Sequence, residues 1–178
     1  MGMVDELRPV PIEVIYTSPC EPARSSAAAI GAELGLPVKE HEGLRNLNQG
    51  LWQGLCIEEI RRKHPKVFKL WQESPESICP PEGEMISDAM ERVRKALEKP
   101  LKRGISFAIV ASEPLATVIA CHVSGRKLDL THAVCTPDSG YHCEFLRTNG
   151  YQPNAAPVQP AVAVAPGNRL DERCASDS

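Results

Sequence analysis

Apolar residues along the chain fall into short continuous runs and into helical repeats, and the two kinds of segment alternate. Residues 12–16 and 105–111 are apolar and rich in β-branched side chains, which is typical of buried strands. Helical periodicity predicts helices over 22–34, 57–64, 67–72, 86–98 and 115–123. This alternation predicts a three-layer α/β domain, whose mainly parallel sheet carries helices on both faces.

Glycine and proline mark the expected ends of these elements. Gly35 follows the first of the long helical repeats, where a helix commonly ends in a left-handed residue. Pro100 predicts the end of the helix that begins at Ile86. A Pro-Asp-Ser-Gly sequence between residues 134–135 and 141–146 predicts a β-hairpin.

The character of the sequence changes near residue 152. Residues 1–151 carry the patterned segments and are predicted to form one α/β domain. Residues 152–178 are rich in proline and alanine and then become polar. Because such a segment buries too little apolar surface to order itself, we predict a flexible tail over 152–178.

Length and charge narrow the classes of protein to consider. A chain of 178 residues suits one domain, and its formal net charge of −3 argues against a dedicated nucleic-acid binder. No stretch approaches the roughly 18 apolar residues of a membrane helix, and the first residues lack a signal-peptide pattern. Seven cysteines without a signal peptide are typical of reduced thiols, so we predict a cytoplasmic protein with neither nucleic acid nor membrane as partner.

Four segments share their order and spacing with the motifs of one enzyme family. They read VIYTSPCEPARSSAAAIGAELGLPV, LRNLNQGLWQGL, PEGEM at 81–85 and VASE at 110–113. Together they resemble the histidine phosphatase superfamily, whose fold is that of phosphoglycerate mutase, from about residue 3 to residue 128. The resemblance implies an α/β scaffold built for phosphoryl transfer.

The family's chemistry implies particular residues. A histidine in an Arg-His-Gly motif after the first strand attacks phosphorus, arginines and a second histidine neutralise the phosphoryl oxygens, and a carboxylic acid protonates the leaving oxygen. This sequence contains no Arg-His-Gly and begins near the end of the helix that follows that strand. We therefore expect a sheet lacking the family's central first strand. Its unpaired edges would leave the chain marginally stable or homo-oligomeric.

Three further catalytic positions of the family are altered. Pro22 stands for an arginine, Asn46 for the acid and Ser112 for the second histidine, and Glu113 replaces the neighbouring glycine. An amide cannot deliver a proton, and serine supplies no cation. A carboxylate about 4 Å from a phosphate costs on the order of 4 kcal/mol at an effective dielectric constant of 20. We therefore predict a pseudoenzyme that serves as a binding or interaction module.

Under this hypothesis the ancestral pocket holds a neutral or cationic small molecule. The predicted binding residues are polar side chains of the four motifs: Ser18, Arg24, Asn46, Glu84, Ser112 and Glu113. For Glu84, a purely structural hydrogen bond is an equal alternative. We predict no catalytic residue, cofactor or metal. The alternative function is a phosphomonoester phosphatase or phosphoglycerate-mutase-like enzyme whose nucleophile segment is missing from this chain.

Two cysteine arrangements also carry potential chemistry. Residues 121–126 resemble the cysteine phosphatase loop but are one residue short and lie in an apolar helix, which favours Cys121 as a core residue. Four potential metal ligands surround the predicted hairpin: His132, Cys135, His142 and Cys143. Seven residues between the two cysteines do not match the usual zinc spacing, so facing strand residues are favoured over a metal site.

Overall fold

The computed structural model describes residues 3–53, 55, 57–77, 79–128, 130, 143–145 and 161–164. The helices are α1 (Met3–Leu7), α2 (Ala23–Leu34), α3 (Ile57–Lys63), α4 (Pro65–Glu73), α5 (Ile86–Arg103) and α6 (Leu115–Ser124). The strands are β1 (Val14–Thr17), β2 (Val38–Glu40), β3 (Phe107–Ala111), β4 (Cys143–Phe145) and β5 (Ala161–Val164). Short 3₁₀ helices are η1 (Glu42–Leu44), η2 (Gly50–Trp52) and η3 (Pro75–Ser77).

The strands form one sheet in the order β2-β1-β3-β5-β4. β1 is parallel to both β2 and β3, and β3 is parallel to β5. β4 is antiparallel to β5 and forms one edge. The α/β fold with parallel strands that the sequence predicts is therefore confirmed.

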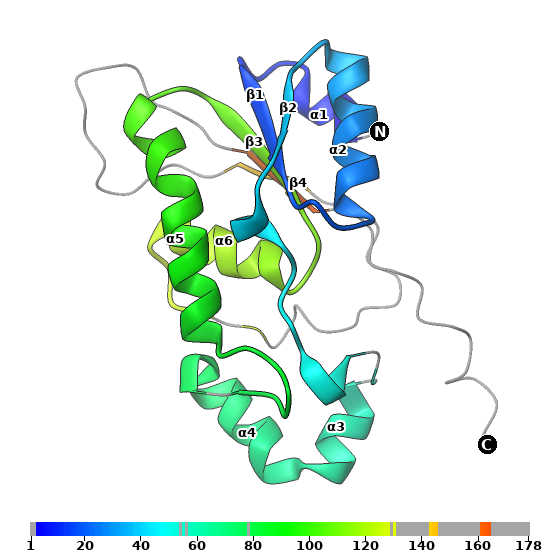
Figure 1. Ribbon diagram of the computed structural model, residues 1–178, viewed down its shortest axis with the longest axis vertical. Coiled ribbons are helices and arrows are strands. Elements are labelled where there is room, and N and C mark those ends of the chain that lie inside the picture. Colours follow the sequence, from blue (N-terminus) through cyan, green and yellow to red (C-terminus); the bar gives the residue numbers. More distant parts are fainter. Residues whose placement is uncertain are drawn as a thin grey trace, which may run out of the picture.

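Helices cover both faces of this sheet (Figure 1). Phe107 and Ile109 of β3 join the apolar cluster that includes α5 and α6, whereas Ala108 and Val110 join the cluster of α1 and α2. All five residues of β3 are fully buried. This alternation follows from the two-residue period of a strand, and it makes the sheet the middle of three layers.

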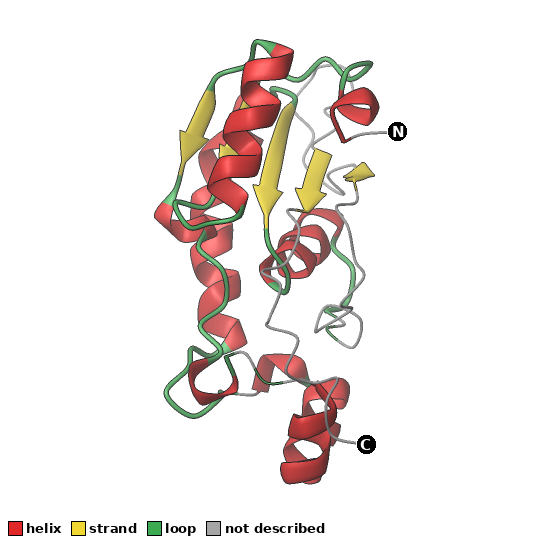
Figure 2. Ribbon diagram, turned by 90° about the vertical axis from the view of Figure 1, so that its right-hand side faces the viewer, coloured by secondary structure: helices red, strands yellow, loops and turns green. Residues whose placement is uncertain are grey.

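Helices α3 and α4 lie beyond the carboxyl ends of the parallel strands (Figure 2). Val67 and Phe68 of α4 are partly buried against the larger apolar cluster, while Leu70 remains exposed. Among the described residues, no helix is both long enough and apolar enough to cross a membrane.

Two element boundaries depend on packing that the local sequence does not reveal. Gly35 ends α2 in a left-handed conformation, with φ of 67°, as predicted. The predicted helix end at Pro100 is wrong, because α5 continues to Arg103 and ends at Gly104, with φ of 65°. Pro100 is buried on the core-facing side with Leu97, and this packing offsets the backbone hydrogen bond that proline cannot donate.

The second boundary concerns the C-terminal segment. Ala161–Val164 lie within the segment for which the sequence predicts a flexible tail, and they form β5, which pairs with β3 and β4. Within the described sheet β3 therefore has a partner strand on each side. Within the predicted hairpin, residues 143–145 form β4, whereas residues 134–135 lie outside the described residues, as does the rest of 152–178.

Candidate functional site

The carboxyl ends of β1 and β3 lie side by side, because Thr17 pairs with Val110 in the sheet. Ser18 and Ser112 follow these two strands directly and are only 3% and 9% exposed. The Ser18 hydroxyl accepts a hydrogen bond from the backbone N–H of Cys20 at 3.0 Å and so stabilises the turn into α2. Two of the predicted binding residues thus reach the same edge of the sheet.

Asn46 joins the loop after β2 to the turn after β3. Its Nδ2 donates to the backbone carbonyl of Glu113 at 2.8 Å. Its Oδ1 accepts from the backbone N–H groups of Leu115 at 3.2 Å and Leu47 at 2.9 Å. Both lone pairs of the amide oxygen are therefore occupied by backbone donors. The side chain holds two segments together at the position where the family resemblance implies a proton donor.

The carboxylate of Glu113 lies against the start of α6. Its Oε2 accepts a hydrogen bond from the backbone N–H of Thr117 at 3.2 Å. A negative charge at a helix N-terminus is favourable, because the first N–H groups lack partners within the helix. This contact gives the carboxylate a structural role at α6, where the sequence suggested a charge that opposes phosphate.

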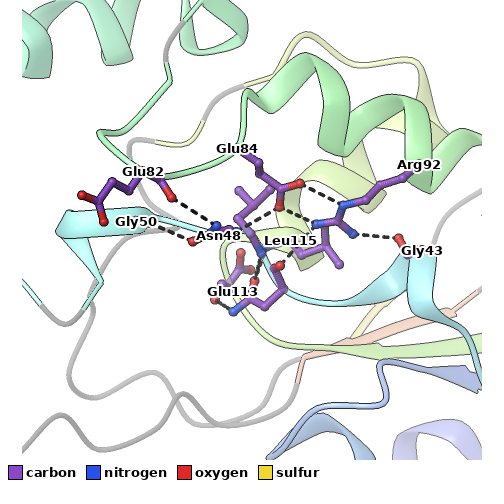
Figure 3. A network of polar contacts seen from close by, with 10 residues as sticks. Gly43, Asn48, Gly50, Glu82, Glu84, Arg92, Glu113 and Leu115 are labelled. Carbon is purple, nitrogen blue, oxygen red and sulfur yellow. Dashed lines mark hydrogen bonds and ion pairs between the residues drawn. The ribbon is translucent and has the colours of Figure 1, made fainter.

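Glu84 and Arg92 form a bidentate ion pair beside this turn (Figure 3). Arg92 donates from Nη2 to Glu84 Oε1 at 2.8 Å and from Nε to Glu84 Oε2 at 3.1 Å. Its Nη1 donates to the carbonyl of Gly43 at 2.8 Å, and its Nη2 to the carbonyl of Asn46 at 3.2 Å. The two side chains are only 16% and 13% exposed, which strengthens such a pair relative to one in water.

Asn48 extends the network to the Pro-Glu-Gly-Glu segment (Figure 3). Its backbone N–H donates to Glu84 Oε1 at 2.9 Å, and its carbonyl accepts from the N–H of Glu84 at 2.9 Å. Its side chain also contacts the Glu82 carbonyl and the Gly50 N–H. Gly50 has φ of 52°, and a Cβ there would lie 2.0 Å from the Pro81 carbonyl oxygen. Glycine is therefore required where the two loops meet.

The protonation of Glu84 follows from these contacts. Burial by itself raises the pKa of its carboxyl group, but hydrogen bonds from Arg92 and from the Asn48 backbone, with the charges of Arg92 and Arg45, lower it below the ordinary 4.5. Glu84 is therefore ionised at neutral pH and bound to Arg92. In this arrangement it serves as an acceptor and not as a proton donor.

A small cavity of about 20 Å³ lies beside the network. Eight residues line it: Leu47, Asn48, Gln49, Trp52, Pro80, Glu84, Ile86 and Pro114. This space suffices for about one water molecule. Among the described residues, no group of three or more His, Cys, Asp or Glu side chains is placed to hold a metal.

The remaining candidates lie away from this network or outside the described residues. Arg24 is 53% exposed on α2, and its Nε donates to Glu21 at 2.8 Å. Cys121 is buried in α6, consistent with a core cysteine. His132, Cys135 and His142 lie outside the described residues, and only the backbone of Cys143 is described.

Sequence reasoning missed two members of the network. Arg92 lies eight residues after Glu84 in the chain, in the helix that follows the Pro-Glu-Gly-Glu segment, and this proximity was the available signal. Asn48 lies in a glycine-containing loop, and its role depends on tertiary contacts with Glu82 and Glu84. No local pattern identifies such a residue.

Comparisons with known proteins match this sequence to one family. The model of the histidine phosphatase superfamily (branch 1) matches residues 2–146. Phosphoserine phosphatase 1 of Hydrogenobacter thermophilus is 26% identical over 129 residues, covering 72% of this chain and 61% of that protein. The bifunctional protein Rv2228c of Mycobacterium tuberculosis is 29% identical over 123 residues, covering 69% of this chain and 31% of that protein.

Solved structures agree with the family match. Bacillus stearothermophilus YhfR is 25% identical, with a TM-score of 0.59 over 71% of this chain and 64% of that one. The mycobacterial glucosyl-3-phosphoglycerate phosphatase Rv2419c with inorganic phosphate shares the fold at 22% identity, with a TM-score of 0.61 over 71% of this chain and 66% of that one. The chain spans less than two thirds of the length of each of these relatives. On the family match over residues 2–146, the chain belongs to the histidine phosphatase superfamily, branch 1.

Proposed function

We propose that residues 1–178 form a histidine-phosphatase-like domain that does not turn over phosphomonoesters and acts as a binding or interaction module. The hydrogen bonds of the Asn46 side chain support this proposal most directly. At the position where the resemblance implies the family's acid, its amide is bonded to the backbone of Glu113, Leu115 and Leu47. An amide held in this way has no proton to transfer to a leaving oxygen.

The neighbouring strand ends support the same proposal. Ser112, which stands for the second histidine under the family resemblance, is a small neutral side chain at the edge where family chemistry needs a cation beside the phosphoryl group. Glu84, the nearby carboxylate, is ionised and paired with Arg92. Each phosphate oxygen brought to this edge would therefore meet fewer compensating charges than a phosphatase provides.

A thermal-shift comparison tests the binding part of the proposal. Metabolites are applied as matched pairs, each phosphorylated compound with its dephosphorylated counterpart. We expect stabilisation by the neutral or cationic member of a pair and none by the phosphorylated member. The Ser112→Ala variant tests whether binding depends on the side chain that follows β3. The Ser87→Ala variant, which changes an exposed residue of α5, serves as the control. Stabilisation by the phosphorylated members alone contradicts the proposed ligand class.

A second candidate function is phosphomonoester hydrolysis by the whole protein, and the comparisons support it more directly. Both the Hydrogenobacter relative and the mycobacterial structure are named as phosphatases. Because residues 1–178 contain no Arg-His-Gly sequence, the histidine nucleophile of this candidate would have to come from outside them.

The coding DNA upstream of Met1 separates the two candidates. An in-frame Arg-His-Gly segment, together with phosphoserine hydrolysis by the extended protein, would establish the second candidate. A segment with another residue at that histidine would favour the first. A longer protein that hydrolyses no phosphomonoester would also favour it.

A further inference from the structure

The strand β5 occupies the interior of the sheet although it comes from the C-terminal segment. Ala161, Val162, Ala163 and Val164 pair in parallel with Ala108, Ile109, Val110 and Ala111 of β3. On the other side β5 pairs with β4, which is antiparallel. In the described sheet β4 has no other neighbour, so its attachment to β3 passes through β5.

The environment of β3 explains why this position needs an occupant. All of Phe107–Ala111 are fully buried, so water does not reach the backbone groups of β3. Unpaired buried N–H and C=O groups cost free energy comparable to a lost hydrogen bond. β1 satisfies one side of β3, and the other side depends on β5.

The sequence of the segment suits a short inserted strand. Residues 161–164 read Ala-Val-Ala-Val, without a charge or a polar side chain. Pro160 and Pro166 flank them, and proline cannot donate a ladder hydrogen bond. The two prolines therefore limit the length of the strand, four residues of which pair with β3. This segment also lies beyond the family match, which ends at residue 146.

We propose that the slot between β3 and β4 is a binding site for a short parallel strand, and that the chain's own Ala161–Val164 is its occupant. The C-terminal segment then acts as a separable ligand of the domain, joined to it through residues 146–160. Binding uses backbone hydrogen bonds on both sides of the strand, as in other cases of strand addition to a sheet. The inference concerns the pairing of β3 within residues 1–178, and its tests do not use phosphomonoester hydrolysis.

Hydrogen exchange on the full chain tests the occupancy of the slot. Val162→Pro removes a ladder donor from β5, and Leu170→Pro places the same residue type in the C-terminal segment beyond the strand. We expect Val162→Pro to lose protection at those amides of Phe107–Ala111 that face β5, and to melt at a lower temperature. Leu170→Pro should keep the protection and melting temperature of the parent. Equal protection of β3 in all three proteins would overturn the proposal.

Rescue in trans tests whether the strand is separable. A peptide of residues 158–167 is added in excess to the Val162→Pro protein, with a scrambled peptide of the same composition as the control. We expect the native peptide to restore protection to Phe107–Ala111 and to raise the melting temperature, and the scrambled peptide to do neither. Failure of the native peptide to bind or to restore protection would overturn a separable strand.

Discussion

The Asn46 side chain has a structural role that the family resemblance does not imply. Where the resemblance implies a proton donor, the side chain instead bonds the backbone of Glu113, Leu115 and Leu47. The amide therefore supplies a donor and an acceptor to the same turn at once. An ionised carboxylate could supply only the acceptor.

Removal of the Asn46 amide should destabilise the fold. Asn46→Ala removes the hydrogen bonds to the Glu113 carbonyl and from the Leu115 N–H, which costs about 1–3 kcal/mol of unfolding free energy. Asn46→Asp keeps the acceptor and should cost less. Urea unfolding measures both values, with the exposed Gln53→Ala as the control. An Asn46→Ala protein as stable as the parent would contradict the connecting role.

The Glu84–Arg92 pair predicts a pH dependence of stability. The folded-state pKa of Glu84 lies below its ordinary value of 4.5, so the unfolded chain takes up the proton first as the pH falls. The stabilisation is therefore complete above pH 4.5 and is lost as the pH falls through the folded-state pKa. Glu84→Gln should make the acid side of the stability curve shallower.

Urea unfolding between pH 7 and pH 3 measures this curve. The matched control is Glu73→Gln, which changes an exposed carboxylate of α4. If Glu84→Gln and the parent lose stability with the same slope, the pair does not contribute to acid sensitivity in the way its geometry implies.

At the scale of elements, the pattern of apolar residues predicted most of the fold, because β1, β3, α2 and α6 bury continuous or periodic apolar faces. β2 escaped prediction because Val38 is its only apolar residue, and it is only partly buried. β5 escaped because the five residues between Pro160 and Pro166 resemble a loop until β3 and β4 provide hydrogen-bond partners for Ala161–Val164. The candidate site, like the fold, could be predicted only in part. The motifs brought Ser18, Asn46 and Ser112 to notice, whereas the contacts that occupy Asn46 are tertiary.

A buried leucine of α5 and an exposed leucine of α4 offer a matched test of how much apolar packing contributes to the free energy of unfolding. Leu97 of α5 is 1% exposed, whereas Leu70 of α4 is 46% exposed. Leu97→Ala removes buried methyl groups and leaves a cavity, which costs about 2–5 kcal/mol, and Leu70→Ala should change stability by less than about 0.5 kcal/mol. Chemical denaturation of the two variants gives the comparison. Similar values for both would contradict the described placement of α5.

At the scale of the whole molecule, a superfamily scaffold carries Ser18 and Ser112 at the ends of β1 and β3, and the structural Asn46 in the loop after β2. The family match extends over residues 2–146, and the sheet is completed by β5 beyond it. Within the described sheet, β3 has a partner strand on each side. Association through the outer strands β2 and β4 stays a prediction, which sedimentation of the purified chain would test.

The most direct test of the central claim is a turnover measurement on purified residues 1–178. Phosphoserine and p-nitrophenyl phosphate are the substrates, and released phosphate is compared among the parent, Asn46→Ala, Ser112→Ala and the control Ser87→Ala. The account predicts no release above the buffer rate in any of the four. Release by the parent and the control that disappears in Asn46→Ala or Ser112→Ala would contradict it.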